Sequence, residues 1–399
     1  MPGGALIPAV RIPAAGRASG LSIRVHERIA DVDPAEWDSL LAPEDIQASH
    51  RFIRVCEDSD VEHPVYRHVM IERSGRLVAV ATLCRILVSL DLLSSGRTRS
   101  AIQWARRWRS SFLKLPMVLC GLPVSFGASC VRIRPGEDPA AIVAALAALA
   151  ESTARELGAQ LVCFKEFAAE ESPAFDSLRR RGYVRSASLP FCTLPIPWRS
   201  FDEYLGSARA GYRRQILASL RSARAAGLTL QMVDDFGPAC EGIFRLYGQV
   251  MDRAEFQLER LNLAFFERLN AYLGPQSRAM LVHRGGDLVA AAVLLETPRD
   301  MTFLLAGIDY ASNRECHAYP FLVTRIVDEA IRRGARSLHL GQTSYALKGR
   351  LGSRSEPRWF FLKHRASLRN ALLRAASGAL FPTATVPARR VFRDAARSR

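Results

Sequence analysis

One lysine-containing segment is the strongest candidate for chemistry in this sequence. Residues 342–352 read Gln-Thr-Ser-Tyr-Ala-Leu-Lys-Gly-Arg-Leu-Gly and directly follow an apolar stretch, 337–340, that is typical of a strand. A segment in this position lies at the carboxyl edge of a sheet, where ligands commonly bind. The ammonium of Lys348 could there stabilise an oxyanion or hold a phosphate, and Gly349 and Gly352 would let a ligand approach the backbone. On its own, the segment is also compatible with a lysine that is simply a surface charge.

Two neighbours of Lys348 could share its chemistry. The family resemblance of this chain, given below with the residues that carry it, implies transfer of an acyl group to an amine; the attacking amine then needs a base, and the oxyanion that forms needs hydrogen-bond donors. His339, in the preceding strand, could be the base because imidazole titrates near neutral pH, or it could be a packed strand residue. Tyr345 could donate to a leaving thiolate or simply pack. Lys348, His339 and Tyr345 are therefore the candidate catalytic residues.

Candidate binding residues lie at helix starts and strand ends. We expect a helix to begin at Pro320, and the free N–H groups at its start favour a pyrophosphate or carboxylate. His317 and Tyr319 precede it, either as ligand contacts or as capping residues. The candidates for holding a cofactor or co-substrate are Gln342, Gly349, Arg350, Gly352, His317, Tyr319, Arg213 and Arg214. Asp309 and Glu296 are candidates for binding the amine, and Arg213 and Arg214 also fit an exposed helix face.

Several common site types are absent from the sequence. It contains no G-x-G-x-x-G after a strand, no Walker loop, no H-E-x-x-H and no G-x-S-x-G. The eight cysteines are scattered and form no C-x-x-C pair, which argues against a zinc site or a disulfide scaffold. We therefore expect no metal and no permanently bound cofactor.

The net charge of +16 is concentrated in three segments, 97–114, 205–225 and 365–399. Only four of the 55 basic residues are lysines, a skew that GC-rich coding can also produce. Such clusters attract phosphates of coenzyme A, a carrier-protein arm, tRNA or anionic lipid, or they are simply solvated faces. Trp104 and Trp108 stand among the arginines of the first segment, as a lipid-facing or stacking patch or as core residues.

The order of expected elements repeats along the chain. Gly75-Arg76-Leu77-Val78-Ala79 and Gly286-Asp287-Leu288-Val289-Ala290 each follow a hairpin turn, and each half later has a helix, a glycine and an apolar strand. The pattern predicts an α+β protein with two tandem domains, each a mixed central sheet flanked by helices. We expect a tail at 1–20, a first domain at 21–197 with an insertion at 91–127, a second domain at 198–365, and a basic helix and tail at 366–399.

The chain resembles the FemAB-like and BioF-like acyltransferases of the GNAT superfamily, in the branch named for peptidoglycan biosynthesis or recognition. The resemblance is carried by residues 200–205, 212–214, 263–269 and 345–352, within 190–365, and loosely by 177–183 of the first half. It implies tandem GNAT-like domains and transfer of an acyl or aminoacyl group to an amine. The lysine that stabilises transition-state charge in FemX-type enzymes would be Lys348. Leu347 stands where the family commonly has an aromatic residue, and His339 where it often has an acid.

We therefore expect an N-acyltransferase in which acyl-CoA or an acyl-carrier protein donates to a small-molecule amine by direct attack. The donor would lie between the 342–352 segment and the helix at Pro320. One alternative is an aminoacyl-tRNA-dependent transferase that acts on a cell-envelope precursor. Another is an inactive GNAT scaffold that binds anionic membrane or RNA. Residues 1–20 lack a signal-peptide core, and the apolar stretch 115–127 is too short and too interrupted to span a bilayer. We therefore expect a cytoplasmic protein. A second possibility is a cytoplasmic protein whose basic segments contact the inner face of the membrane.

Overall fold

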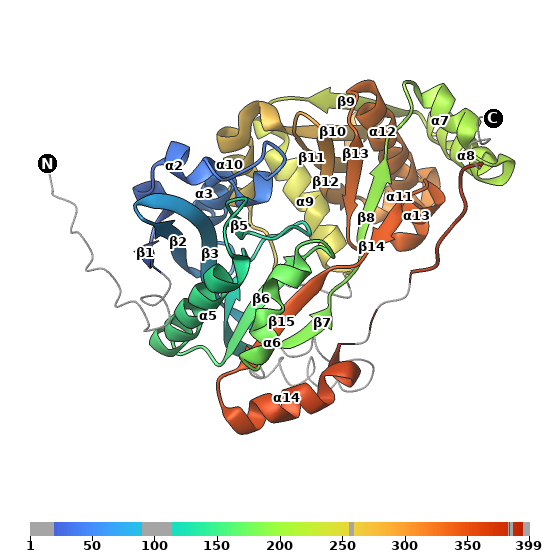
Figure 1. Ribbon diagram of the computed structural model, residues 1–399. Coiled ribbons are helices and arrows are strands. Elements are labelled where there is room, and N and C mark those ends of the chain that lie inside the picture. The colour runs from blue at the N-terminus through green and yellow to red at the C-terminus, as the bar shows by residue number, and fades with distance from the viewer. Residues whose placement is uncertain (1–19, 90–113, 255–258, 382, 384–385, 394–399) are drawn as a thin grey trace, which may run out of the picture. The chain divides into compact units, whose positions relative to one another are not determined.

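The computed structural model describes residues 20–89, 114–254, 259–381, 383 and 386–393 (Figure 1). The chain forms two compact units. The first unit contains residues 1–188 and 358–383, and the second contains 189–357 and 384–399. Most of the expected tail 1–20 and residues 91–113 of the expected insertion lie outside the described residues, as do Trp104 and Trp108.

The described part of the first unit has an eight-stranded sheet in the order β1-β2-β3-β4-β6-β15-β7, with β5 paired to β3. The strands are β1 (Leu21–His26), β2 (Val65–Arg73), β3 (Arg76–Ser89), β4 (Lys114–Cys120), β5 (Arg132–Ile133), β6 (Leu161–Phe167), β7 (Val184–Ala187) and β15 (Trp359–His364). All pairs are antiparallel except β4 with β6. Strand β4 therefore occupies part of the segment, 91–127, that we expected to be an insertion.

Helices of the first unit follow local signals in the sequence. They are α2 (Pro34–Asp38), α3 (His50–Asp58), α5 (Pro139–Glu156), α6 (Ser177–Arg180) and α14 (Ser367–Leu380), with short 3-10 turns at Ile29–Asp31, Ile46–Ala48 and Ser172–Phe175. The Asp138 side chain caps α5 by accepting a hydrogen bond from Ala140 N, and Pro139 starts the helix. Ile142 and Leu146 of α5 are fully buried in the core that also contains Phe164.

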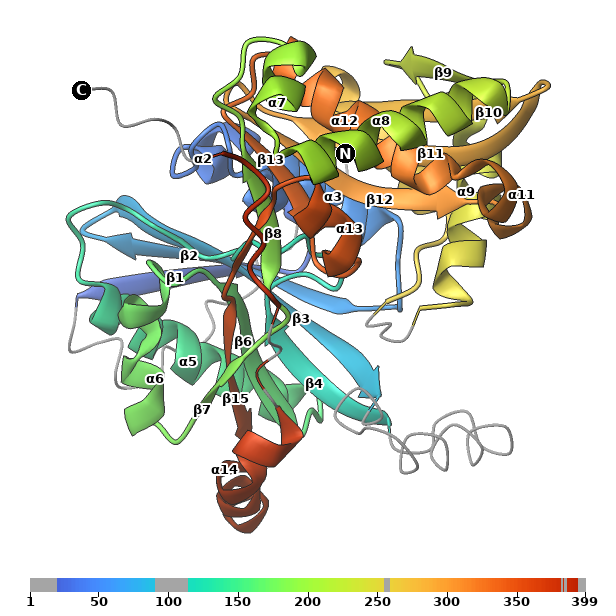
Figure 2. The same cartoon turned by 90° about the vertical axis from the view of Figure 1, so that its right-hand side faces the viewer.

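The second unit has a seven-stranded sheet over its described residues, in the order β14-β8-β13-β12-β11-β10-β9. Its strands are β8 (Phe191–Pro195), β9 (Leu228–Val233), β10 (Ser277–Arg284), β11 (Asp287–Glu296), β12 (Asp300–Ile308), β13 (Ser337–Gly341) and β14 (Arg354–Glu356). Its helices are α7 (Phe201–Ser207), α8 (Ala210–Ala225), α9 (Cys240–Met251), α10 (Leu263–Leu273), α11 (Tyr310–Cys316), α12 (Ala318–Arg332) and α13 (Tyr345–Arg350), with 3-10 turns at Gly237–Ala239 and Gly274–Gln276. Figure 2 shows α8 and α12 on the same side of this sheet.

Each unit contains one short parallel pair of strands over its described residues. In the second unit, β12 and β13 pair only from Asp300 with Ser337 to Thr302 with His339. In the first unit, β4 and β6 pair from Met117 with Leu161 to Cys120 with Phe164. The repeat of hairpin, helix, glycine and strand that the sequence indicated is thus present in both units.

Two strands belong to the opposite unit from the one we expected. β8 was placed in the first domain, but it pairs with β13 and β14 of the second sheet. β15 was expected to close the second domain, but it pairs with β6 and β7 of the first sheet. The boundaries at 197 and 365 are therefore wrong, because strand pairing is decided by long-range hydrogen bonds that hydropathy does not encode. No helix in the described ranges combines the length and apolarity needed to cross a bilayer.

Candidate active site in the second unit

The lysine segment starts with a strained turn and continues as a short helix. Gly341, Thr343 and Ser344 all have positive φ angles, of 71°, 72° and 50°. A left-handed conformation is unfavourable for a β-branched residue such as Thr343, and strain of this kind tends to concentrate at functional sites. The turn leads into α13, which carries Lys348 on its inner side.

Lys348 is a buried cation. Its residue is 3% exposed, and its Nζ donates a hydrogen bond of 3.0 Å to the carbonyl oxygen of Gln342. Within the described part of the chain no carboxylate forms an ion pair with it. Loss of hydration lowers the pKa of Lys348 to about 8. A buried ammonium without a counter-ion is unfavourable unless a ligand or a reaction uses it.

The Lys348 ammonium lies where the parallel strands separate. It is 6.0 Å from the ring centre of Phe303, the first β12 residue beyond the last pair with β13. Its acceptor, Gln342, directly follows β13. Over the described residues, β12 and β13 do not pair beyond Thr302 and His339. The backbone of β12 on that side can therefore hydrogen-bond an extended ligand beside the ammonium.

Several candidate residues hold the turn in place. The Gln342 amide donates to Leu189 O at 2.7 Å, and the Tyr345 hydroxyl donates to Pro190 O at 3.0 Å. The Tyr319 hydroxyl forms a hydrogen bond with Ser344, and burial raises the pKa of Tyr319. Gln342, Tyr345 and Tyr319 thus lie around Lys348, but these hydrogen bonds give them a positioning role.

A groove lined by several arginines lies beside α13 in the same unit. The groove has a volume of about 800 Å³ and lies among α8, the start of α12, α13 and the C-terminal segment 386–393. Its lining includes Arg209, Arg350, Arg389 and His317, and no acidic residue among those described lines it. Arginines without acids favour a phosphate-bearing ligand. His317 and Arg350 were expected to contact a ligand, whereas Arg209 and Arg389 were not.

The C-terminal segment 386–393 packs against α7, α8 and α13 as a strap. Arg209 N donates to Val391 O at 2.9 Å, and the Phe392 ring lies 4.7 Å from the ring of Trp198. A Cβ on Gly352, whose φ is 96°, would clash with the Phe392 ring, and a Cβ on Gly349 would lie 3.3 Å from Arg389 Cδ. The two glycines therefore make room for the strap, and not for a ligand as we expected.

His339 lies on the opposite face of the sheet from Lys348. Its flanking residues Leu338 and Leu340 are buried in the core that includes α12 and Phe303. Because side chains alternate along a strand, His339 faces the other way. There its Nδ1 is 3.5 Å from Thr302 Oγ1, and its ring is 5.7 Å from that of Phe191. The structure does not bring His339 to the ammonium.

Four other candidates lie away from Lys348 or have another role. Asp309 caps α11 by accepting hydrogen bonds from Ala311 N and Ser312, and these bonds, led by the one from Ser312, lower its pKa. Glu296 is the last residue of β11, where it pairs with Met301 near the start of β12, and it forms ion pairs with Arg278 and Arg333. Arg213 and Arg214 are on α8 but do not line the groove. We therefore assign none of the four to the site.

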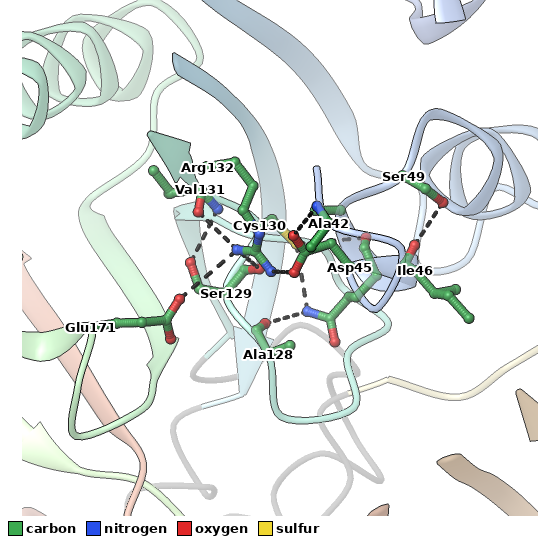
Figure 3. Close-up of polar contacts among 12 residues, drawn as sticks. Ala42, Asp45, Ile46, Ser49, Ala128, Ser129, Cys130, Val131, Arg132 and Glu171 are labelled. Atoms are coloured by element: carbon green, nitrogen blue, oxygen red, sulfur yellow. Dashed lines mark hydrogen bonds and ion pairs between the residues drawn. The ribbon is translucent and has the colours of Figure 1, made fainter. Parts of the chain in front are cut away.

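The corresponding strand end in the first unit carries different polar groups, which the sequence analysis did not single out. Glu166, the residue before the last one of β6, has a positive φ of 67°. Its carboxylate accepts a hydrogen bond from Ser125, and burial raises its pKa. Nearby loops are joined by Arg132, which pairs with Asp45 at 2.5 Å and with Glu171 at 3.9 Å (Figure 3). Arg132 and its two carboxylate partners therefore fasten loops of this unit.

Comparison with known proteins places the chain in a family. Residues 28–304 match the FemAB-like family, described as peptidoglycan biosynthesis/recognition. Two curated relatives from Mycobacterium tuberculosis, strains CDC 1551 and H37Rv, both bear the name "Putative 8-amino-7-oxononanoate synthase 2" and are 24% identical over 320 residues. That alignment covers 78% of this chain but 41% of each relative, so the chain spans less than half of their length.

Solved structures share the fold at low sequence identity. FemX is 12% identical with a TM-score of 0.52, over 85% of this chain and 96% of that chain. A tandem GNAT protein from the clavulanic acid biosynthesis pathway is 14% identical with a TM-score of 0.51, over 87% of this chain and 99% of that chain. These likenesses confirm the expected α+β class with two tandem GNAT-like domains. The chain therefore belongs to the FemAB-like family and has the tandem GNAT fold.

Proposed function

We propose that the second unit transfers an acyl group from acyl-CoA or an acyl-carrier protein to a small-molecule amine. The observation that carries this proposal is the buried Lys348 ammonium, which has no carboxylate partner among the described residues and lies where β12 and β13 separate. With a pKa of about 8, this ammonium is mostly protonated at neutral pH. An oxyanion that forms beside it would supply the missing negative charge.

The proposed reaction is direct attack. The amine nitrogen forms a bond to the donor's carbonyl carbon, and the carbonyl oxygen becomes an oxyanion that accepts a hydrogen bond from Lys348 Nζ. Collapse of this intermediate breaks the bond to the leaving thiolate, and the proton lost by the amine passes to the leaving group or to water. His339 is not proposed as the base, because it faces the opposite side of the sheet.

The groove favours a donor that carries phosphates. Its arginines and its volume of about 800 Å³ suit one elongated small-molecule arm. Such an arm is present in coenzyme A and on an acyl-carrier protein. The acyl end of the donor would then extend along the unpaired side of β12 to Lys348. Gln342, Tyr345 and Tyr319 would hold the turn that carries the lysine.

Aminoacyl-tRNA is the second candidate donor, with a cell-envelope precursor as acceptor. It is favoured by the match to a family described as peptidoglycan biosynthesis/recognition and by the fold shared with FemX. The phosphates at the end of the tRNA would bind the same arginines of the groove. An inactive scaffold that binds anionic membrane or RNA is the remaining alternative.

A donor panel with detection of products by intact mass tests the proposal. Acyl-CoA, acyl-carrier protein and aminoacyl-tRNA are each offered with a set of small amines and with a peptidoglycan-precursor amine. Acylated product from acyl-CoA or the carrier protein supports the main proposal, and product from aminoacyl-tRNA alone supports the second candidate. Absence of turnover with every donor, together with salt-sensitive binding of vesicles or RNA, would instead assign the protein to the scaffold class.

A further inference from the structure

Helix α14 exposes an apolar stripe. Leu368 is 75% exposed and Leu372 is 62% exposed, and their spacing of four residues places them on the same face of the helix. Ala375 and Ala379 extend this exposed face along the helix. Isolated exposed leucines are ordinary in proteins, but two on successive turns of one helix form a patch that marks an interaction surface.

The opposite face of α14 packs against the first unit, and this packing turns Leu368 and Leu372 toward solvent. The Asn370 amide donates to Gly182 O at 2.9 Å, and its side-chain oxygen accepts from His364 N at 2.9 Å. At the end of the helix, the ring of Phe381 lies 5.0 Å from that of Phe360. Figure 1 shows α14 beside β15. The orientation of the leucines is therefore set by specific contacts.

The exposed stripe is accompanied by positive charge. Arg365, Arg369 and Arg374 are exposed around it, and the sequence has no acidic residue from Arg365 through Arg393. Arg365 donates to Ala159 O at 3.0 Å and Arg369 to Gln160 Oε1 at 3.4 Å, which keeps both close to the helix. Apolar residues with arginines beside them are the pattern of a helix that lies in a membrane interface.

We propose that α14 docks this protein on an anionic lipid surface. Leu368 and Leu372 would enter the boundary between headgroups and acyl chains, and Arg369 and Arg374 would contact lipid phosphates. A nucleic acid would gain little from the leucines, and a second copy of the chain would place arginines against arginines. The apolar stripe together with the arginines beside it therefore favours anionic lipid. This inference does not depend on the proposed transfer reaction.

Co-sedimentation with vesicles tests the inference on the full chain. We expect binding to vesicles of phosphatidylglycerol mixed with phosphatidylcholine, weakening as salt is raised, and little binding to pure phosphatidylcholine. The double variant Leu368→Gln/Leu372→Gln and the double variant Arg369→Gln/Arg374→Gln should each lower the affinity by about tenfold or more. Because these side chains are exposed, the thermal unfolding temperature should stay unchanged.

Two matched control variants distinguish binding through α14 from nonspecific hydrophobic or electrostatic binding elsewhere on the protein. Leu87 is another exposed leucine, 45% exposed on β3, and Arg390 is an exposed arginine outside the helix. Leu87→Gln and Arg390→Gln should bind vesicles as the unmodified chain does. Equal binding by the α14 variants and the controls would overturn the inference, as would binding to both vesicle types without preference. A dimer in sedimentation that only the leucine variant abolishes would assign the stripe to a second copy and would also overturn it.

Discussion

At the scale of single residues, Lys348 opposes folding while it prepares the site. Desolvation holds its pKa at about 8 in the folded chain, below the ordinary value of 10.5. The unfolded chain therefore binds more protons between pH 8 and 10.5, and stability should rise with pH across that window. Below pH 8 the full penalty applies, on the order of 3 kcal/mol.

The variant Lys348→Met should accordingly be more stable than the unmodified protein at pH 7, because the buried charge is removed and its volume is kept. The gain in free energy of unfolding should shrink as the pH approaches 10. Chemical denaturation at pH 7, 9 and 10 measures this difference. A variant that is less stable at pH 7, or a difference that does not change with pH, would contradict the assignment of Lys348 as an uncompensated buried cation.

Arg389 and Arg390 form a natural pair for testing the groove, because they are adjacent and only Arg389 lines it. Arg389→Gln should raise the KM for a phosphate-bearing donor by about fivefold, the scale for one exposed charge-assisted contact, with kcat little changed. Arg390→Gln should leave both constants unchanged. Steady-state kinetics with the donor identified by the mass panel decides between them. Equal effects of the two changes would point to general electrostatic attraction.

At the scale of elements, the strap depends on a glycine. Gly352→Ala places a methyl group against Phe392 and also strains a positive φ, so we expect a loss of about 2–4 kcal/mol in unfolding free energy. Gly285 also has a positive φ but has open space around its Cβ position. Gly285→Ala should therefore cost only about 1 kcal/mol. Denaturant titration of both variants tests this, and similar losses would mean that the contact with Phe392 adds nothing.

Local elements were largely predictable from the sequence, whereas their partners were not. The hairpin turn before Asp287 and the basic helix expected within 366–399 are both present. These features depend on neighbouring residues. The helical form of α13 and the strap at 386–393 were missed, because both depend on contacts with residues far away in the sequence. The face occupied by His339 was not considered, although strand alternation indicates that Leu338 and Leu340 point away from it.

At the scale of the whole molecule, the exchange of β8 and β15 makes chain order a poor guide to the folded units. A fragment with residues 198–365 lacks β8, which pairs with both β13 and β14, and carries β15 without its partners. A fragment with residues 189–357 keeps all the strands described for the second sheet. We expect the second fragment to unfold cooperatively and the first to lack tertiary structure, as measured by near-ultraviolet circular dichroism. Equal folding of the two would show that β8 is dispensable.

The two units contain the same order of elements but carry different side chains at the end of the parallel strand pair. Both contain a hairpin, a helix, a glycine and a short parallel pair of strands. In the second unit, a buried lysine follows a strained turn, and a groove lined by arginines lies in the same unit. In the proposed reaction, the Lys348 ammonium stabilises the oxyanion of acyl or aminoacyl transfer.

The most direct test of that claim is the kcat of Lys348→Met, measured with the donor and amine that the mass panel identifies. We predict a decrease of about 10²–10³-fold, the scale for loss of one oxyanion donor, with the donor KM changed only a few-fold and the fold intact. Turnover within a few-fold of the unmodified protein would remove Lys348 from the mechanism and contradict the account.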